Sequence, residues 1–239
     1  MKPTYRPPAY EFLFYLQRNN EIHSGENHIL DCGAGGKTPP LGLFYEHGFQ
    51  TAGIDISDKQ IALAQNFEKE HAMQLNIQKG DIQEIPFPDA SFDFVFEMYA
   101  MVHLPKAGIR RTLSEIKRVL KPHGIAFVSF MSTDTWPMDG KEKAPGEFYC
   151  KEAGENVVHS IFSDEEAFQY CSDWQILYKI KQSLFTPDEV AHTTKKEWLD
   201  FYKETDLQFT QTEWTAFYPQ RVERWKSVHT FFILRKKPQ

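Results

Sequence analysis

The chain has 239 residues, 41% of them hydrophobic, and a net charge of −6. This length accommodates one large α/β domain with its own core, and we expect residues 1–239 to form a single domain. Acidic residues outnumber basic ones, 33 to 27, and neither half of the chain is basic. Because a phosphate backbone needs a concentrated positive face, this balance disfavours bulk RNA or DNA as a substrate.

The sequence carries no signal for secretion, membrane insertion or metal binding. The apolar run 12–16 is too short for a signal-peptide core, and no apolar span of about 18 residues occurs elsewhere. Cys32, Cys150 and Cys171 follow no pairing rule and no metal-ligand spacing. We therefore expect a soluble, cytoplasmic protein with no metal site and no membrane contact. The sequence leaves the oligomeric state open.

The first predicted elements are a helix over residues 8–17 and a strand that ends in a glycine-rich turn over residues 28–38. We expect the helix to pack on the sheet or over the mouth of a cofactor site. Leu30 suits a buried parallel strand, and Thr38 with Pro39 can cap and open a helix. Three glycines after the strand allow positive φ and the close approach of a ligand to the backbone: Gly33, Gly35 and Gly36. The turn is therefore a candidate nucleotide-binding site.

The spacing of the glycines distinguishes between the classes of ligand that such a turn binds. A phosphate-binding P-loop needs glycine at the position of Asp31, and a carboxylate facing a triphosphate is electrostatically unfavourable. Pro39 and Pro40 also remove two backbone N–H donors from the helix N-terminus. The dinucleotide fingerprint needs glycine at the position of Thr38. These mismatches favour a nucleoside cofactor without phosphates, such as S-adenosylmethionine.

Strands and helices then alternate, which predicts a mainly parallel, doubly wound sheet with helices on both faces. A capping box at Ser57 opens a helix through Phe67. An apolar stripe marks another helix, which starts at Pro105 and ends before Gly124. The remaining elements of this half are a helix over 41–47, a strand ending at Asp55, and strands over 75–79, 91–97 and 125–130.

The pattern changes beyond Phe130. Residues 132–160 lack sustained periodicity, so we expect a long loop there. Ser163 is placed to cap a helix, and a second capping signal at 186–189 opens another. The predicted strands of this half cover residues 174–184 and 229–234.

The turn Leu30-Asp-Cys-Gly-Ala-Gly-Gly36 resembles the first motif of the class I (Rossmann-like) S-adenosylmethionine-dependent methyltransferases. Four further segments resemble later motifs of this family and follow in the family's order: residues 51–57, 79–82, 91–104 and 116–128. The family's third glycine falls on Lys37 in this chain. The resemblance implies the Rossmann-like methyltransferase fold, S-adenosylmethionine as cofactor, and in-line methyl transfer to a small-molecule acceptor.

The same resemblance implies a set of cofactor-binding residues. Asp55 stands about 20 residues after Gly33, where a ribose-binding carboxylate is expected. Asp31 would hold the methionine ammonium group, and Asp81 would bind the adenine amino group. Glu97, at the end of the fourth strand, would attract the sulfonium or a cationic substrate. The rest of the set flanks these acids: Gly33, Ala34, Gly35, Ile56 and Ile82.

Each of these residues also has an ordinary structural interpretation. Asp31 and Asp55 can cap turns, and Asp81 can cap a helix over the residues that follow it. Glu97 can be a solvated carboxylate at the rim of the sheet. His103, in the loop after the fourth strand, could act as a base or orient the acceptor, or could be structural.

In this family a short loop joins the last two strands, whereas residues 186–228 intervene here. We therefore expect substrate-covering insertions at 132–160 and 186–228, the second of them a C-terminal lid. Tyr149 and His159 are candidate catalytic residues on the acceptor side, together with His103. The alternative function is a non-catalytic sensor or assembly protein of the same fold that binds S-adenosylmethionine or a nucleoside.

Overall fold

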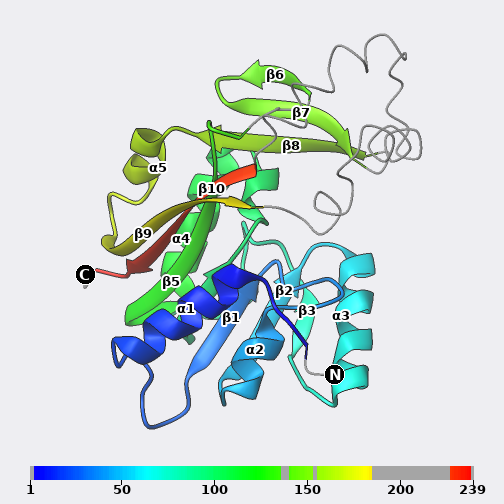
Figure 1. The fold of residues 1–239 in the computed structure, drawn as a ribbon, viewed down its shortest axis with the longest axis vertical. Coiled ribbons are helices and arrows are strands. Elements are labelled where there is room, and N and C mark those ends of the chain that lie inside the picture. Colours follow the sequence, from blue (N-terminus) through cyan, green and yellow to red (C-terminus); the bar gives the residue numbers. More distant parts are fainter. Residues whose placement is uncertain (1–2, 136–139, 153–154, 185–226, 238–239) are drawn as a thin grey trace.

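The computed structural model describes residues 3–135, 140–152, 155–184 and 227–237. Its main sheet has the strand order β3-β2-β1-β4-β5-β10-β9 (Figure 1), in which the first five strands are parallel and β10 is antiparallel to both neighbours. The strands of this sheet are β1 (His28–Cys32), β2 (Gln50–Asp55), β3 (Ile77–Lys79), β4 (Phe92–Glu97), β5 (Leu120–Ser132), β9 (Gln175–Leu184) and β10 (Ser227–Arg235). The predicted mainly parallel, doubly wound sheet is confirmed.

Helices cover both faces of this sheet. The helices are α1 (Pro7–Arg18), α2 (Leu41–Glu46), α3 (Asp58–His71), α4 (Lys106–Val119) and α5 (Asp164–Tyr170), and a short 3-10 helix, η1 (Met101–His103), follows β4. Buried side chains of α1, α2 and α3 pack on one face, and those of α4 and α5 pack on the other. Both predicted serine caps are confirmed, since the side chains of Ser57 and Ser163 accept hydrogen bonds from backbone amides in the first helical turn.

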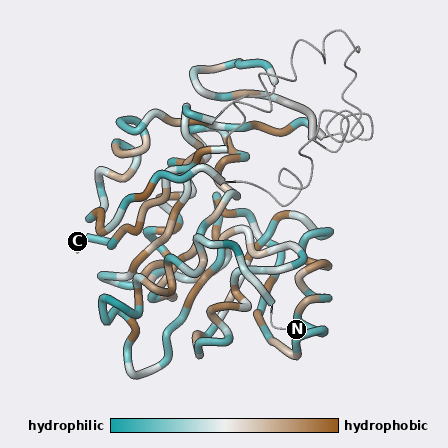
Figure 2. The backbone as a smooth tube through the Cα atoms, in the orientation of Figure 1, coloured by the Kyte–Doolittle hydropathy of each residue, from teal (hydrophilic) through white to brown (hydrophobic). Residues whose placement is uncertain are grey.

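The N-terminal helix α1 packs directly on the sheet, which is one of the two arrangements that the sequence left open. Phe12 is fully buried, and its ring centroid lies 6.0 Å from that of Phe96 and 5.6 Å from that of Phe127. Burial of one such side chain stabilises the fold by about 1.5–3 kcal/mol. Figure 2 colours the backbone by hydropathy. The central strands are mostly brown, that is, hydrophobic, which agrees with this packing.

Residues 141–152 and 155–162 contain three strands where a long loop over 132–160 was predicted. They are β6 (Lys141–Ala144), β7 (Glu147–Glu152) and β8 (Glu155–Phe162), and neighbouring strands are antiparallel. The end of β8 joins the main sheet parallel to the end of β5, at the top of the view in Figure 1. The loop prediction was wrong. These segments lack the alternating polarity by which a strand is recognised in a sequence, and they become strands through pairing with their neighbours.

The predicted helix over 41–47 is confirmed as α2, which begins at Leu41. Thr38 as its cap was wrong, because the N-cap is Pro40 and no side chain caps the helix. The starts of two strands also differ from the prediction. The third strand begins at Ile77, and β5 begins at Leu120, before the glycine expected to release it.

Residues 185–226 lie outside the described residues, so the helix after 186–189 and the lid over 186–228 stay predictions. Within the described part of the chain, none of the helices combines the length and the apolar character that crossing a membrane requires. The cytoplasmic location also stays a prediction.

Candidate cofactor and acceptor site

Two buried acids lie at the carboxyl ends of β1 and β4. β1 pairs with β2 on one side and with β4 on the other, so the strand order reverses at this point. Asp31 is 1% exposed, Glu97 is fully buried, and Glu97 is in register with the neighbouring Cys32. Open α/β sheets bind ligands outside the carboxyl ends of their strands at such a switch point. The residues around it therefore make up the candidate site.

The glycine turn after β1 folds back against β2 and against the loop after β4. The amides of Gly33 and Ala34 donate hydrogen bonds to the carbonyl oxygen of Ile54, over 2.9 and 3.0 Å. Gly33 has a φ of +109°, and a Cβ there would lie 2.7 Å from Cβ of Ala100. Glycine is thus required for the turn and the loop after β4 to lie side by side.

Asp55, the last residue of β2, fixes the glycine turn. Its Oδ2 accepts a hydrogen bond from the amide of Gly35 over 2.9 Å, and its Oδ1 accepts one from the amide of Ser57 over 2.8 Å. Each carboxylate oxygen has a further lone pair, so two ribose hydroxyl groups can donate to the same side chain. The next residue, Ile56, is 69% exposed and offers an apolar flank. The structural role of Asp55 and a ribose-binding role are compatible.

Asp31 presents a buried carboxylate oxygen that lacks a partner. Among the described residues, no group forms a hydrogen bond with its Oδ2. Burial, and then the carboxylates of Glu97 and Asp55, raise the pKa of Asp31 well above its usual range. An ammonium group beside Oδ2 would supply the missing hydrogen bond and offset the negative charge. Asp31 therefore fits the cationic amino acid end of S-adenosylmethionine.

Glu97 organises the loop after β4. Its Oε1 accepts a hydrogen bond from the amide of Met101 over 2.8 Å, and its Oε2 accepts two from Ser129, from the amide over 3.0 Å and from Oγ over 3.2 Å. Burial raises the pKa of Glu97 to about 7, and these hydrogen bonds limit the rise. A solvated rim carboxylate is the wrong interpretation, because the loop folds back onto this side chain. An attraction of Glu97 for the sulfonium stays a prediction.

Asp81 and Ile82 lie in a turn after β3. Oδ1 of Asp81 accepts a hydrogen bond from the amide of Gln83 over 2.8 Å. The segment forms a turn closed by a bridge from Asp81 to Glu84, not the helix that the capping alternative assumed. Ile82 is 9% exposed and belongs to the core that α4 covers. The turn stands at the end of β3, where adenine is expected in this fold.

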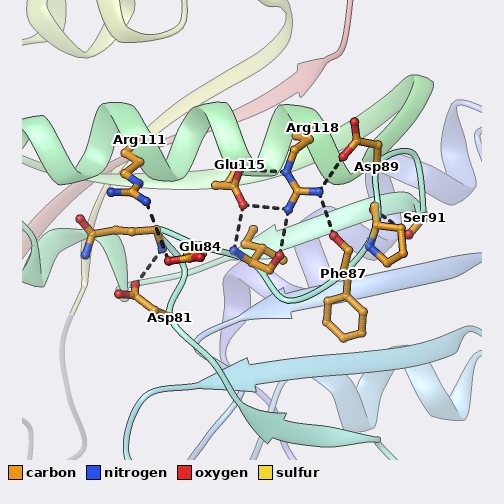
Figure 3. A network of polar contacts seen from close by, with 11 residues as sticks. Asp81, Glu84, Phe87, Asp89, Ser91, Arg111, Glu115 and Arg118 are labelled. Atoms are coloured by element: carbon orange, nitrogen blue, oxygen red, sulfur yellow. Dashed lines mark hydrogen bonds and ion pairs between the residues drawn. The ribbon is translucent and has the colours of Figure 1, made fainter.

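Arg118 of α4 holds the segment that follows this turn (Figure 3). Its guanidinium group donates to the carbonyl oxygens of Ile85 and Phe87, each over 2.8 Å. The same group bonds to the carboxylates of Glu115 and Asp89, and Glu115 accepts a further bond from the amide of Ile85. This network ties the expected adenine turn to a helix on the sheet.

The three candidate catalytic residues on the acceptor side do not all lie together. The ring centroids of His103 and His159 lie 5.1 Å apart. Phe148 is the partner of His159 across β7 and β8, so the adjacent Tyr149 lies on the opposite face of this strand pair. The ring of Tyr149 contacts Lys143, whose Nζ lies 4.2 Å from the ring centroid. The structure brings the two histidines together and leaves Tyr149 apart from them.

Among the described residues, no group of three or more His, Cys, Asp or Glu side chains is arranged to hold a metal ion. A reaction that needs no metal stays a prediction from the sequence.

Comparison with known proteins matches residues 30–128 to the family described as "Methyltransferase domain". The matched range contains the glycine turn, Asp55, Asp81 and Glu97. Residues 30–128 thus match a methyltransferase domain, and the chain has the Rossmann-like fold of class I S-adenosylmethionine-dependent methyltransferases. The cofactor of this class is S-adenosylmethionine.

Relatives of the methyltransferase domain include two fungal proteins. Sterol 24-C-methyltransferase ERG6B of Gibberella zeae is 34% identical over 132 residues, which cover 54% of this chain and 34% of that protein. O-methyltransferase resE of Aspergillus sclerotiorum is 36% identical over 101 residues, which cover 41% of this chain and 38% of that protein. The match thus spans little more than a third of the length of either relative.

A solved structure of a SAM-dependent methyltransferase from Methanosarcina mazei shares the fold along most of the chain. Its TM-score is 0.63 at 19% sequence identity, over 93% of this chain and 98% of that one. The likeness therefore extends beyond residues 30–128.

Sequence reasoning missed three residues beside the methyltransferase motifs. The amide of Tyr99 donates to Oγ of Ser129 over 2.9 Å, and the ring centroid of Tyr99 lies 4.6 Å from that of His229. Tyr99 could have been found, because it follows Glu97 within a recognised motif. Ser129 and His229 carry no local signal, since only strand pairing brings them to this place.

Proposed function

We propose that this chain transfers the methyl group of S-adenosylmethionine to a small-molecule acceptor. The observation that carries the proposal is the buried Oδ2 of Asp31, which lacks a partner among the described residues and lies at the switch point of the sheet. A cofactor with a cationic amino acid end and no phosphates suits this group of acids.

In the proposal, the side chains around the switch point hold the cofactor at separate points. Asp31 binds the ammonium group, Asp55 binds the ribose hydroxyl groups, and Asp81 with Ile82 binds adenine. Bound S-adenosylmethionine supplies an activated methyl group: the acceptor atom bonds to the methyl carbon while the carbon–sulfur bond breaks and its electron pair passes to sulfur. The protein aligns the two reactants, an effect worth up to about 7–11 kcal/mol.

A small-molecule acceptor agrees with the net charge of −6 and with the names of the two fungal relatives. We place the acceptor between the loop after β4 and the segments 132–160 and 186–228, which would cover it. The adjacent rings of His103 and His159 support a role for both histidines in orienting the acceptor. Tyr149 lies on the other face of its strand pair, so it receives weaker support.

The alternative is a sensor or assembly protein that binds the cofactor without turnover. The protein is incubated with metabolite pools and with S-adenosylmethionine labelled in the methyl group, and labelled products are identified by mass spectrometry. We expect labelled product from the parent and from Asp58→Asn, an exposed control on α3, and none from Asp31→Ala. Tight calorimetric binding of S-adenosylhomocysteine, without label transfer to any acceptor, would favour the alternative.

A further inference from the structure

Tyr99 has a backbone conformation that bulky residues rarely adopt. Its φ is +71°, in a left-handed region that is strained for a residue with a large side chain. The surrounding structure enforces this conformation, because the amide of Tyr99 donates to Oγ of Ser129 over 2.9 Å, and that hydroxyl group donates to Oε2 of Glu97 over 3.2 Å. Strain held in place by a buried network is typical of a functional site.

The strained residue lies next to the proposed cofactor. Ala100, which follows Tyr99, is the residue that a Cβ on Gly33 would contact at 2.7 Å. The loop that carries Tyr99 therefore packs against the glycine turn. Tyr99 is half-buried, so its ring keeps an accessible surface.

His229 reaches the same place from the other end of the chain. Because β10 is antiparallel to β5, His229 is in register with Met131 at the carboxyl end of β5. The imidazole is 3% exposed and its ring centroid lies 4.6 Å from that of Tyr99. Its Nε2 lies 3.2 Å from Oγ of Ser227, whereas Nδ1 has no hydrogen-bond partner among the described residues. A buried polar atom without a hydrogen-bond partner is unfavourable, and a ligand that bonds to it would remove this cost.

The charges around these two rings favour an anion. Cζ of Arg6 lies 5.3 Å from the ring centroid of Tyr99. Burial, then Arg6 and His159, lower the pKa of His229 to about 4, so its imidazole is neutral near neutral pH. Burial raises the pKa of Tyr99 to about 12, so its phenol group is also neutral. The carboxyl group of Glu97 also acts on Tyr99, but it is buried and already accepts hydrogen bonds from Met101 and Ser129. An acceptor beside these residues would meet the Arg6 cation and two uncharged rings.

We infer that Tyr99, His229 and Arg6 form the acceptor subsite, and that this subsite takes a planar phenol, methylated on its ionised oxygen. The inference rests on the proposed function. The half-buried ring of Tyr99 offers a flat surface to an aromatic acceptor, and the buried ring of His229 supports it from behind at a centroid distance of 4.6 Å. Nδ1 of His229 supplies a hydrogen bond, and Arg6 stabilises the phenolate charge.

The transfer step balances without a further reactant. The phenol releases its proton to water when it ionises. The phenolate oxygen then bonds to the methyl carbon, the carbon–sulfur bond breaks, and its electron pair passes to sulfur. The products are a neutral methyl ether and S-adenosylhomocysteine, and Arg6 keeps its charge throughout.

The test uses 4-nitrophenol, whose ionised form is yellow, with the full chain and saturating S-adenosylhomocysteine. We expect the probe to bind the complex and its ionised fraction to rise on binding. His229→Phe keeps a ring but removes both nitrogens, and Arg6→Gln removes the cation from an exposed position. We expect each variant to weaken probe binding about tenfold, while the affinity for S-adenosylhomocysteine changes less than about twofold.

Arg18→Gln is the matched control, because Arg18 contacts Phe14 on α1 instead of Tyr99. Unchanged probe affinity in both Arg6→Gln and His229→Phe, or tighter binding of the cationic analogue 4-nitrophenyltrimethylammonium, would overturn the inference. If His229→Phe does not fold, Arg6→Gln decides. Loss of S-adenosylhomocysteine binding by the parent would contradict the proposed function instead, so the two failures are distinguishable.

Discussion

The amide of Gly35 donates a hydrogen bond to Oδ2 of Asp55 over 2.9 Å, and a Cβ on Gly35 would lie 2.5 Å from that same oxygen. The acid fixes the glycine turn, and the missing side chain lets the turn approach the acid. In our account the same carboxylate binds the ribose. The two residues therefore act as one unit in cofactor binding.

Gly35→Ala should lower the affinity for S-adenosylhomocysteine by at least about tenfold. The added methyl group would lie 2.5 Å from both the Asp55 carboxylate and Cβ of Gln60, so the turn or the acid must move. Gly25→Ala is the matched control, since a Cβ there meets nothing within 4 Å. Equal affinities of the two variants by titration calorimetry would argue against a cofactor on this turn.

Asp55→Ala should weaken S-adenosylhomocysteine binding by about 2 kcal/mol, near thirtyfold, because hydrogen bonds to a charged acceptor contribute about 1.5–3 kcal/mol. The protein should remain folded by circular dichroism. Asp58→Asn is the control, because Asp58 lies on the next helix and forms an exposed ion pair with Lys79. If Asp55→Ala binds as tightly as the parent, Asp55 does not hold the ribose.

Gly35 and Asp55 belong to the part of the site that the sequence predicts well. The spacing of glycines and acids, and the serine caps at Ser57 and Ser163, are local signals, and the structure forms the turn and both helices from them. Strands β6 to β8 could not be predicted in this way. Their segments carry no alternation, and each becomes a strand only through a partner that is itself ambiguous in sequence.

The buried Glu97 should make stability depend on pH. Its pKa rises from 4.5 to about 7 on folding, so the folded state binds a proton that the unfolded state has released between these values. The stabilisation from this proton is full below about pH 4.5 and is lost as the pH rises through about 7. The contribution of Glu97 to the free energy of unfolding therefore differs by about 3 kcal/mol between these two pH limits.

Urea unfolding of the parent and of Glu97→Gln at about pH 5 and about pH 8 tests this linkage. The amide does not titrate, so the stability of the parent relative to the variant should fall by about 2.5 kcal/mol between the two pH values. Glu70→Gln, exposed on α3, should show no such change. A pH-independent difference between the parent and Glu97→Gln would contradict the assignment of this carboxyl as the titrating group.

Arg118→Ala should destabilise the protein by about 2 kcal/mol and weaken S-adenosylhomocysteine binding severalfold. The change leaves the carbonyl oxygens of Ile85 and Phe87 without their guanidinium donor and releases the segment after the adenine turn. Arg111→Ala is the control from the same helix, because its ion pair with Glu84 is exposed and 4.0 Å long, and such pairs contribute less than about 1 kcal/mol. Thermal unfolding and calorimetry measure both effects. Equal stability of the two variants would show that the network does not support the turn.

The residues on the acceptor side could not be predicted from the sequence, because the strand topology brings them together. Tyr99 and His229 are far apart in the chain and meet because β10 enters the sheet antiparallel to β5. Ser129 faces Glu97 only through the pairing of β4 with β5. Tyr149 and His159 looked equivalent in sequence, yet the register of β7 and β8 separates them onto two faces.

The central claim is that S-adenosylmethionine binds at the switch point between β1 and β4. A crystal structure of the complex with S-adenosylhomocysteine, grown after dialysis against a chelator, tests this most directly. We predict the ligand amino group within hydrogen-bond distance of Oδ2 of Asp31, both ribose hydroxyl groups on Asp55, adenine beside Asp81 and Ile82, and no metal ion in contact with the ligand. A ligand bound elsewhere, or an Asp31 carboxylate that still lacks a partner in the complex, would contradict the account.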